Sequence, residues 1–152
     1  MELKLFDKQF ESITKEMVEI AFEMADFNNK EVDVIFILGS IEDGIIHFKV
    51  FFSIKGVICR PQDAFKYSTA FNNLSSDKQV QIQRLGNESL QSLKDLFSSN
   101  NRDIPTLIKM KFRPKEGELT CKLSYELQYS NSETRGFVDV YNDWIKEEKN
   151  LL

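Results

Sequence analysis

The sequence has little of the chemistry that catalytic and metal sites use, with one histidine and two cysteines in 152 residues. A structural zinc site needs four clustered Cys or His ligands, so we expect no metal and no cofactor. A nucleophile needs an adjacent base, and His47 is the only histidine that Cys59 or Cys121 could use. A Cys59–His47 pair stays open, although we favour a histidine exposed on the polar side of a strand. The sequence therefore predicts a protein that is not an enzyme.

Motifs that bind phosphate or carry out acid–base chemistry are also missing. Gly39 follows a predicted strand, but neither GxGxxG nor GxxxxGK[ST] occurs, so we expect a turn there. Carboxylate pairs at 42–43 and 116–118 fall at predicted hairpin tips, where water keeps carboxylates ionised. We expect solvated charges at both tips rather than catalytic pairs.

Long apolar runs are absent too. The longest candidate, 32–38, contains Asp33 and is far shorter than the ~20 residues that span a bilayer. The first ten residues, MELKLFDKQF, carry charges from the second position onward, which is unlike a signal peptide. We expect a cytoplasmic protein that has no membrane contact and keeps its cysteines reduced.

An excess of basic residues is missing as well. The chain has 24 acidic and 20 basic residues, a net charge of −4. Nucleic-acid binders need lysine and arginine stripes that neutralise phosphates, so we expect no nucleic acid as a partner. The negative charge favours a basic partner, but a charge of this size also serves solubility alone. The sequence leaves both interpretations open.

Hydrophobic residues are plentiful, at 41% of the chain, and 13 of them are phenylalanines. A chain of this length buries roughly two-thirds of its unfolded surface around one core. We therefore expect residues 1–152 to form one domain. Because the phenylalanines exceed what such a core needs, some are expected at an interface with a partner.

The first third of the chain predicts a helix followed by a three-stranded meander. Apolar residues recur at helical spacing over 7–27, with Asp7 as the N-cap. Strands are then predicted at 32–38, 45–54 and 57–60, and the Asp-Gly pair at 43–44 predicts a hairpin between the first two. In the second strand the even-numbered positions are apolar, which predicts one buried face that Phe51 alone contradicts.

The remainder predicts a second helix, a hairpin and a third helix. A loop at 61–74 precedes a helix over 76–99 that Gly86 weakens. Strands at 106–113 and 118–129 follow, and then a short helix over 137–145. The order is α-βββ-α-ββ-α, which predicts an α+β fold with an antiparallel sheet packed by helices.

One stretch carries a pattern seen in a known family. The span 90–126 contains a helix end of the form LxxLxxxF, a Thr at the entry to a strand, a turn with Gly, and a strand that ends at Tyr-Glu. These features lie at Leu90, Leu93, Phe97, Pro105-Thr106, Gly117 and Tyr125-Glu126. The pattern resembles the YezG-like antitoxin family of bacterial immunity proteins, and the first helix and the 39–52 hairpin look similar too. An aromatic residue often precedes the Thr in that family, where this chain has Pro105.

The resemblance implies a protein that binds and neutralises the toxic domain of a cognate secreted effector, a nuclease. Nucleases are basic where they hold phosphates, so we expect carboxylates to face the partner. The expected partner-binding residues are Glu42, Asp43, Glu116, Glu118, Asp139, Asp143, Glu147 and Glu148, with Tyr141 or Trp144 as an aromatic anchor. The alternative for Trp144 is that it packs the last helix onto the sheet.

Two other functions stay open from the sequence. The order of elements is similar to that of the class I chaperones of type III secretion, which are homodimers that hold an unfolded effector segment. A small-ligand or enzymatic domain would need a deep pocket beside Cys59, Cys121 or His47. The sequence leaves open whether the protein is a monomer or a homodimer.

Overall fold

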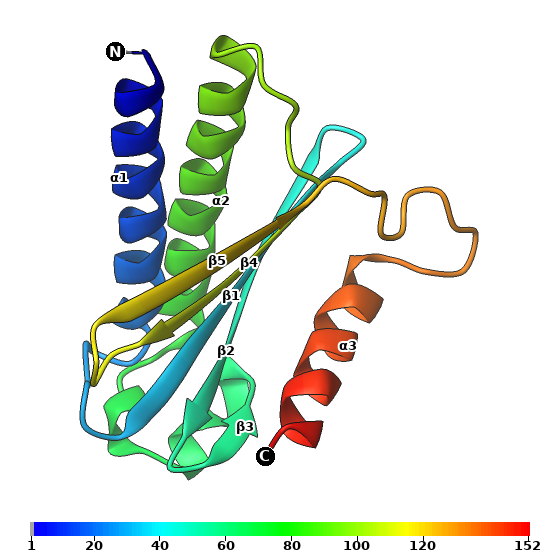
Figure 1. The fold of residues 1–152 in the computed structure, drawn as a ribbon. Helices are drawn as coiled ribbons and strands as arrows, with labels where there is room; N and C mark the ends of the chain where they lie inside the picture. The colour runs from blue at the N-terminus through cyan, green and yellow to red at the C-terminus, as the bar shows by residue number, and fades with distance from the viewer. Residues whose placement is uncertain (1) are drawn as a thin grey trace.

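The structure is a computed structural model that describes residues 2–152. Its elements, in chain order, are α1 (Glu2–Glu23), β1 (Val32–Glu42), β2 (Ile45–Ile54), β3 (Val57–Cys59), the 3-10 helices η1 (Pro61–Lys66) and η2 (Thr69–Phe71), α2 (Ser76–Ser99), β4 (Leu107–Arg113), β5 (Glu118–Ser124) and α3 (Phe137–Asn150) (Figure 1). The predicted order and the α+β class are confirmed.

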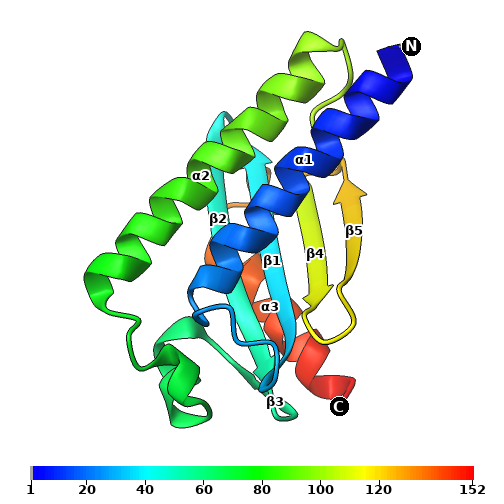
Figure 2. The same cartoon turned by 90° about the vertical axis from the view of Figure 1, so that its left-hand side faces the viewer.

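The five strands form one antiparallel sheet in the order β3-β2-β1-β4-β5, with β1 at its centre. The helices α1 and α2 run antiparallel to each other across one face, and α3 lies on the other (Figures 1 and 2). Because helices cover both faces of β1, its sequence is nearly continuously apolar instead of alternating between apolar and polar residues. In the described residues, no helix combines the length and the apolar character that crossing a bilayer demands.

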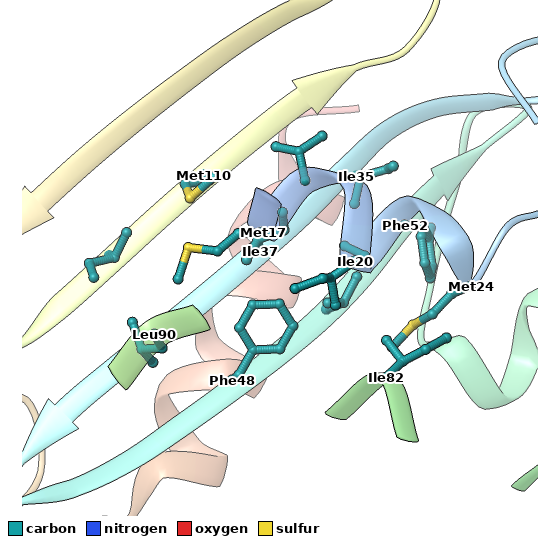
Figure 3. Packing of buried hydrophobic residues seen from close by; sticks show 14 of the residues in the cluster. Met17, Ile20, Met24, Ile35, Ile37, Phe48, Phe52, Ile82, Leu90 and Met110 are labelled. Atoms are coloured by element: carbon teal, nitrogen blue, oxygen red, sulfur yellow. The ribbon is translucent and has the colours of Figure 1, made fainter. Parts of the chain in front are cut away.

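The larger hydrophobic cluster lies between the sheet and the α1–α2 pair. Met17 from α1, Leu90 from α2 and Ile37 and Phe48 from the sheet meet there, each at most 1% exposed (Figure 3). The helical spacing of three and four in α1 and α2 and the spacing of two in the strands bring these side chains to one layer.

A second cluster lies on the opposite face, between the sheet and α3. Phe36 and Phe51 stack with their ring centroids 4.3 Å apart, and the Trp144 ring meets both edge-on at 5.6 and 5.1 Å. This cluster explains why Phe51 interrupts the polar side of β2. The prediction of one buried face for that strand is wrong, because α3 covers the other.

Several predicted boundaries are wrong. Helix α1 begins before Asp7, so Asp7 lies inside it, and it ends at Glu23, before Asp26 and Phe27 adopt positive φ angles. The predicted loop 61–74 contains η1 and η2 instead of irregular chain. Strand β5 ends at Ser124, and beyond it the Thr106 hydroxyl donates to the Glu126 carbonyl and the Gln128 N–H donates to the Glu42 carboxylate.

Candidate partner-binding surface

The two aromatic residues predicted as anchors hold α3 on the sheet. Trp144 is 2% exposed and Tyr141 is 8% exposed. The Tyr141 hydroxyl donates to the Val50 carbonyl oxygen at 2.8 Å, and Trp144 Nε1 donates to a Glu148 carboxylate oxygen at 3.2 Å. Neither ring is accessible to a partner. The packing interpretation of Trp144 is confirmed, and the anchor interpretation is wrong for both residues.

The hydroxyl of Tyr141 predicts a measurable loss of stability on its removal. Burial raises the pKa of Tyr141, so the hydroxyl remains a proton donor at any ordinary pH. Tyr141→Phe leaves the Val50 carbonyl without this donor, and we expect the free energy of unfolding to fall by about 1 kcal/mol in urea titrations. Tyr67→Phe is the control, because in the described residues no hydrogen bond is made by the Tyr67 hydroxyl. Equal stability of both variants would show that the bond contributes nothing.

The predicted carboxylates of α3 each have a partner within the protein. Asp143 and Glu147 are the more accessible, with side chains 55% and 65% exposed. Their ion pairs are therefore weak and can exchange for contacts with another molecule. The four pairings are Asp139 with the Gly136 N–H (2.7 Å), Asp143 with Arg135 (2.8 Å), Glu147 with Lys109 (3.9 Å) and Glu148 with Lys111 (2.9 Å).

Glu42 does not lie at a solvated hairpin tip, so its prediction as a partner-facing residue is wrong. It is 3% exposed. Its carboxylate accepts hydrogen bonds from the backbone N–H groups of Gln128, Tyr129 and Ser130 at 2.9, 3.4 and 3.0 Å, and from the Ser130 hydroxyl at 2.7 Å. The carboxylate fixes the start of the connection to α3.

The remaining predicted carboxylates, Asp43, Glu116 and Glu118, are exposed, but they do not share one surface. Ile35 pairs with Phe112, so the turn of the β4–β5 hairpin lies beyond the start of β1, whereas Asp43 follows its end. At ~3.3 Å per residue the two hairpin tips are roughly 30 Å apart, at opposite ends of the sheet (Figure 1). The ten predicted residues are thus not one binding face.

The groups that might form a nucleophile and a base are kept apart. Cys59 pairs with Phe52, five positions along β2 from His47, or about 16 Å at ~3.3 Å per residue. The His47 ring stacks on Phe137 with centroids 4.4 Å apart, and burial, helped by the charge of Lys49, lowers the pKa of His47. The hypothesis of a Cys59–His47 pair is wrong, and so is the expectation of an exposed histidine.

The thiols themselves are poor nucleophiles. Burial raises the pKa of Cys59 to about 11, to which the nearby Asp63 adds. Both cysteines are reduced, and at neutral pH both thiols stay protonated.

The structure brings together basic residues that the charge balance did not indicate. Four cations project from β4 and β5 on the side of α3: Lys109, Lys111, Arg113 and Lys122, called here the cationic row. They line a hollow of about 420 Å³ against the C-terminal half of α3. Lys109, Lys111 and Arg113 are spaced by two in the sequence, which places them on one face of a strand. This spacing in the sequence is enough to predict three members of the cationic row.

The sheet ends in β3 on one side and in β5 on the other, and since β3 pairs only with residues 52–54 of β2, residues 45–51 of β2 form part of the first edge. Along β2, Gln83 Nε2 donates to the Phe48 carbonyl and Tyr141 donates to the Val50 carbonyl, so side chains from α2 and α3 cap this edge. A hollow of about 440 Å³ remains beside it. Strand β5, on the far side, is exposed from Glu118 to Lys122. Its outer edge is the candidate surface for a protein partner, with the cationic row beside it.

No model of a known protein family matches the chain. A comparison with curated proteins likewise finds no match.

Proposed function

We propose that this protein is a non-catalytic immunity protein, which binds the toxic domain of a cognate secreted nuclease in the cytoplasm and neutralises it by protein–protein contact. The observation that carries the proposal is the uncovered edge of β5 beside a cationic row. An exposed strand edge offers backbone donors and acceptors that another polypeptide can pair with. The resemblance of residues 90–126 to YezG-like antitoxins supports the same class.

The surroundings of the reactive side chains support binding rather than catalysis. His47 is stacked in an aromatic cluster, and the two thiols are protonated at neutral pH. A nucleophile needs a base within hydrogen-bond reach, and the only histidine is about 16 Å from Cys59 at ~3.3 Å per strand residue.

The β4–β5 hairpin presents charges of both signs to a partner. Glu116 and Glu118 are exposed near its turn, and Lys122 is exposed further along β5. A nuclease combines basic phosphate-binding groups with carboxylates that hold metal ions. Complementary charge on the inhibitor raises both the association rate and the specificity.

The proposal is tested by capture and by neutralisation. The tagged protein is purified from its native cytosol, the co-purifying proteins are identified by mass spectrometry, and light scattering gives the stoichiometry. We expect a secreted protein with a C-terminal toxic domain whose expression stops growth and whose toxicity is relieved by co-expression of this chain. A captured toxic domain that the chain fails to neutralise would contradict the proposal. A homodimer that holds an unfolded effector segment would support a chaperone instead.

A further inference from the structure

We propose that the partner docks by adding an extended segment to the outer edge of β5, with an acidic side chain placed beside Lys122. The inference rests on the proposed function in that it requires a protein partner, and it names the surface and the chemistry that this partner must have.

The backbone of β5 is open along its length. The Ser124 carbonyl accepts a hydrogen bond from the N–H of Thr106, the residue that precedes β4. Even-numbered residues of β5 are therefore turned toward β4, and the N–H and C=O groups of Leu119, Cys121 and Leu123 point outward. In residues 2–152 no element lies on that side of β5, since it ends the strand order. These groups are available to an added strand.

The edge of β2 is a poorer choice. Its outward carbonyls at Phe48 and Val50 are already bonded to Gln83 and Tyr141. Tyr141 is buried in the cluster under α3, so an added strand would have to displace it. On β5 an added strand would displace only water.

The cationic row determines the charge of the added segment. Lys109 and Lys122 lie directly opposite each other in register, and like charges in that position destabilise a sheet. Lys109 is partly neutralised by Glu147 at 3.9 Å and lies over the Trp144 ring at 5.3 Å. Lys122 makes no ion pair in the described part of the chain. A carboxylate on the next strand would form an ion pair with Lys122.

The pairing geometry favours that carboxylate. Because the N–H and C=O of Lys122 point toward β4, its neighbour on an added strand would form a non-hydrogen-bonded pair. Side chains in such pairs lie closer than in hydrogen-bonded pairs. An Asp or Glu at this position would meet the Lys122 ammonium directly, while alternate residues would meet the apolar side chain of Leu119 on the other face.

Two other occupants fit less well. A nucleic acid would meet the carboxylates of Glu147 and Glu148 at the rim of the hollow, and Trp144 is buried, so it cannot stack on a base. A second copy of the chain would bring the cationic row against itself. A segment with an acidic residue opposite Lys122 and apolar residues opposite Leu119 and Cys121 is complementary on both faces.

The experiment uses a short synthetic peptide that alternates glutamate and valine, titrated against ¹⁵N-labelled protein. We expect saturable shifts at the amides of Leu119, Cys121 and Leu123 that weaken as salt is added. The same peptide with alternate backbone nitrogens methylated cannot form the ladder, and a peptide with lysine in place of glutamate has the wrong charge, so neither should bind. Binding by the methylated peptide, or no shift at millimolar peptide, would overturn the proposal.

Reversing the charge of Lys122 distinguishes a role in docking a partner from a role in preventing edge-to-edge aggregation. A lysine on an edge strand can serve only to prevent aggregation, and Lys122→Glu keeps a charge there while reversing its sign. We expect peptide affinity to fall by about tenfold or more, with the melting temperature unchanged or raised because the like-charge pair is removed. The control is Lys15→Glu on the exposed face of α1. Equal loss in both variants, or an oligothymidine that shifts the same amides more strongly than the peptide, would overturn the proposal.

The outcomes also separate this inference from the proposed function. If a captured toxic domain is neutralised equally by the wild type and by Lys122→Glu, the immunity function stands and the docking mode is wrong. If the peptide binds β5 as expected but the captured partner is not a toxin, the docking mode stands and the immunity function is wrong.

Discussion

Gly86→Ala is expected to destabilise the protein by up to about 2 kcal/mol, although alanine is the better helix former. In an unconstrained helix this change stabilises by about 1 kcal/mol. Here a Cβ at position 86 would overlap the ring of Phe48, because α2 packs closely against β2 at this glycine. Overpacking of a filled core costs about 1–3 kcal/mol and occasionally more, and Phe48 is fully buried. Guanidinium titrations give the free energy of unfolding and so measure the net result of the gain in helix propensity and the cost of overpacking.

Two further variants make the cause of that loss clear. Ser92→Ala lies on the exposed side of the same helix, and we expect no loss there. Phe48→Leu removes the ring that the new methyl would overlap, so the double variant should be less destabilised than the sum of the single changes. Strict additivity, or a stabilising Gly86→Ala, would show that the helix shifts away from β2 without penalty.

The order of elements was predictable because it depends on local periodicity. Spacing of three and four defined α1 and α2, and the Asp43-Gly44 pair located the first hairpin through a turn that requires positive φ, as both residues show. Gly86 was different. Its weak helix propensity was visible, but the reason for a glycine there is the ring of Phe48 on another element, which no local pattern shows.

The second face of the sheet was not predictable from the strands alone. Phe51 looked like an exception within an amphipathic strand until α3, more than eighty positions later in the chain, covered it. The same helix, α3, also covers part of His47, whose ring stacks on Phe137. A histidine in mid-strand is exposed or buried according to what covers it, and the cover here is distant in sequence.

The location of charged groups on the candidate surface was likewise only partly predictable from the sequence. Carboxylates were assigned to a partner because they are numerous and stand near predicted turns. The fold uses Glu42, Asp139 and Glu148 for hydrogen bonds and ion pairs of its own. Net charge describes the whole chain and carries no information on local clustering. The cationic row depends on the register that sets Lys109 opposite Lys122, and register is fixed only when the hairpin forms.

Glu42→Gln is expected to lower the free energy of unfolding by about 2–3 kcal/mol at neutral pH. The carboxylate accepts four hydrogen bonds, three of them from consecutive backbone N–H groups of residues 128–130. The amide keeps one acceptor oxygen and turns an NH₂ group toward these donors, so buried donors lose their partner, at about 1–3 kcal/mol each before relaxation. Because residues 128–130 precede α3, their amides should also exchange with deuterium faster in the variant.

The pH dependence of this loss identifies the charge as its cause. Burial raises the pKa of Glu42, but the hydrogen bonds from the Ser130 hydroxyl and from the backbone of residues 128–130 outweigh burial and hold the pKa below its ordinary value of 4.5. The unfolded carboxyl then binds a proton at a higher pH than the folded one. Its stabilisation is complete above about pH 5 and is lost as the pH falls through the folded pKa.

The difference in stability between wild type and Glu42→Gln should therefore be constant from neutral pH down to about pH 5 and shrink below it. Glu118→Gln, a change of the same chemistry at an exposed position, provides the control and should cause no comparable loss of stability. A gap that stays constant into strong acid would mean that the side chain's shape, and not its charge, holds the connection to α3. In that case the Glu42 carboxyl would have the same pKa in the folded and unfolded states, which its four hydrogen-bond donors make unfavourable.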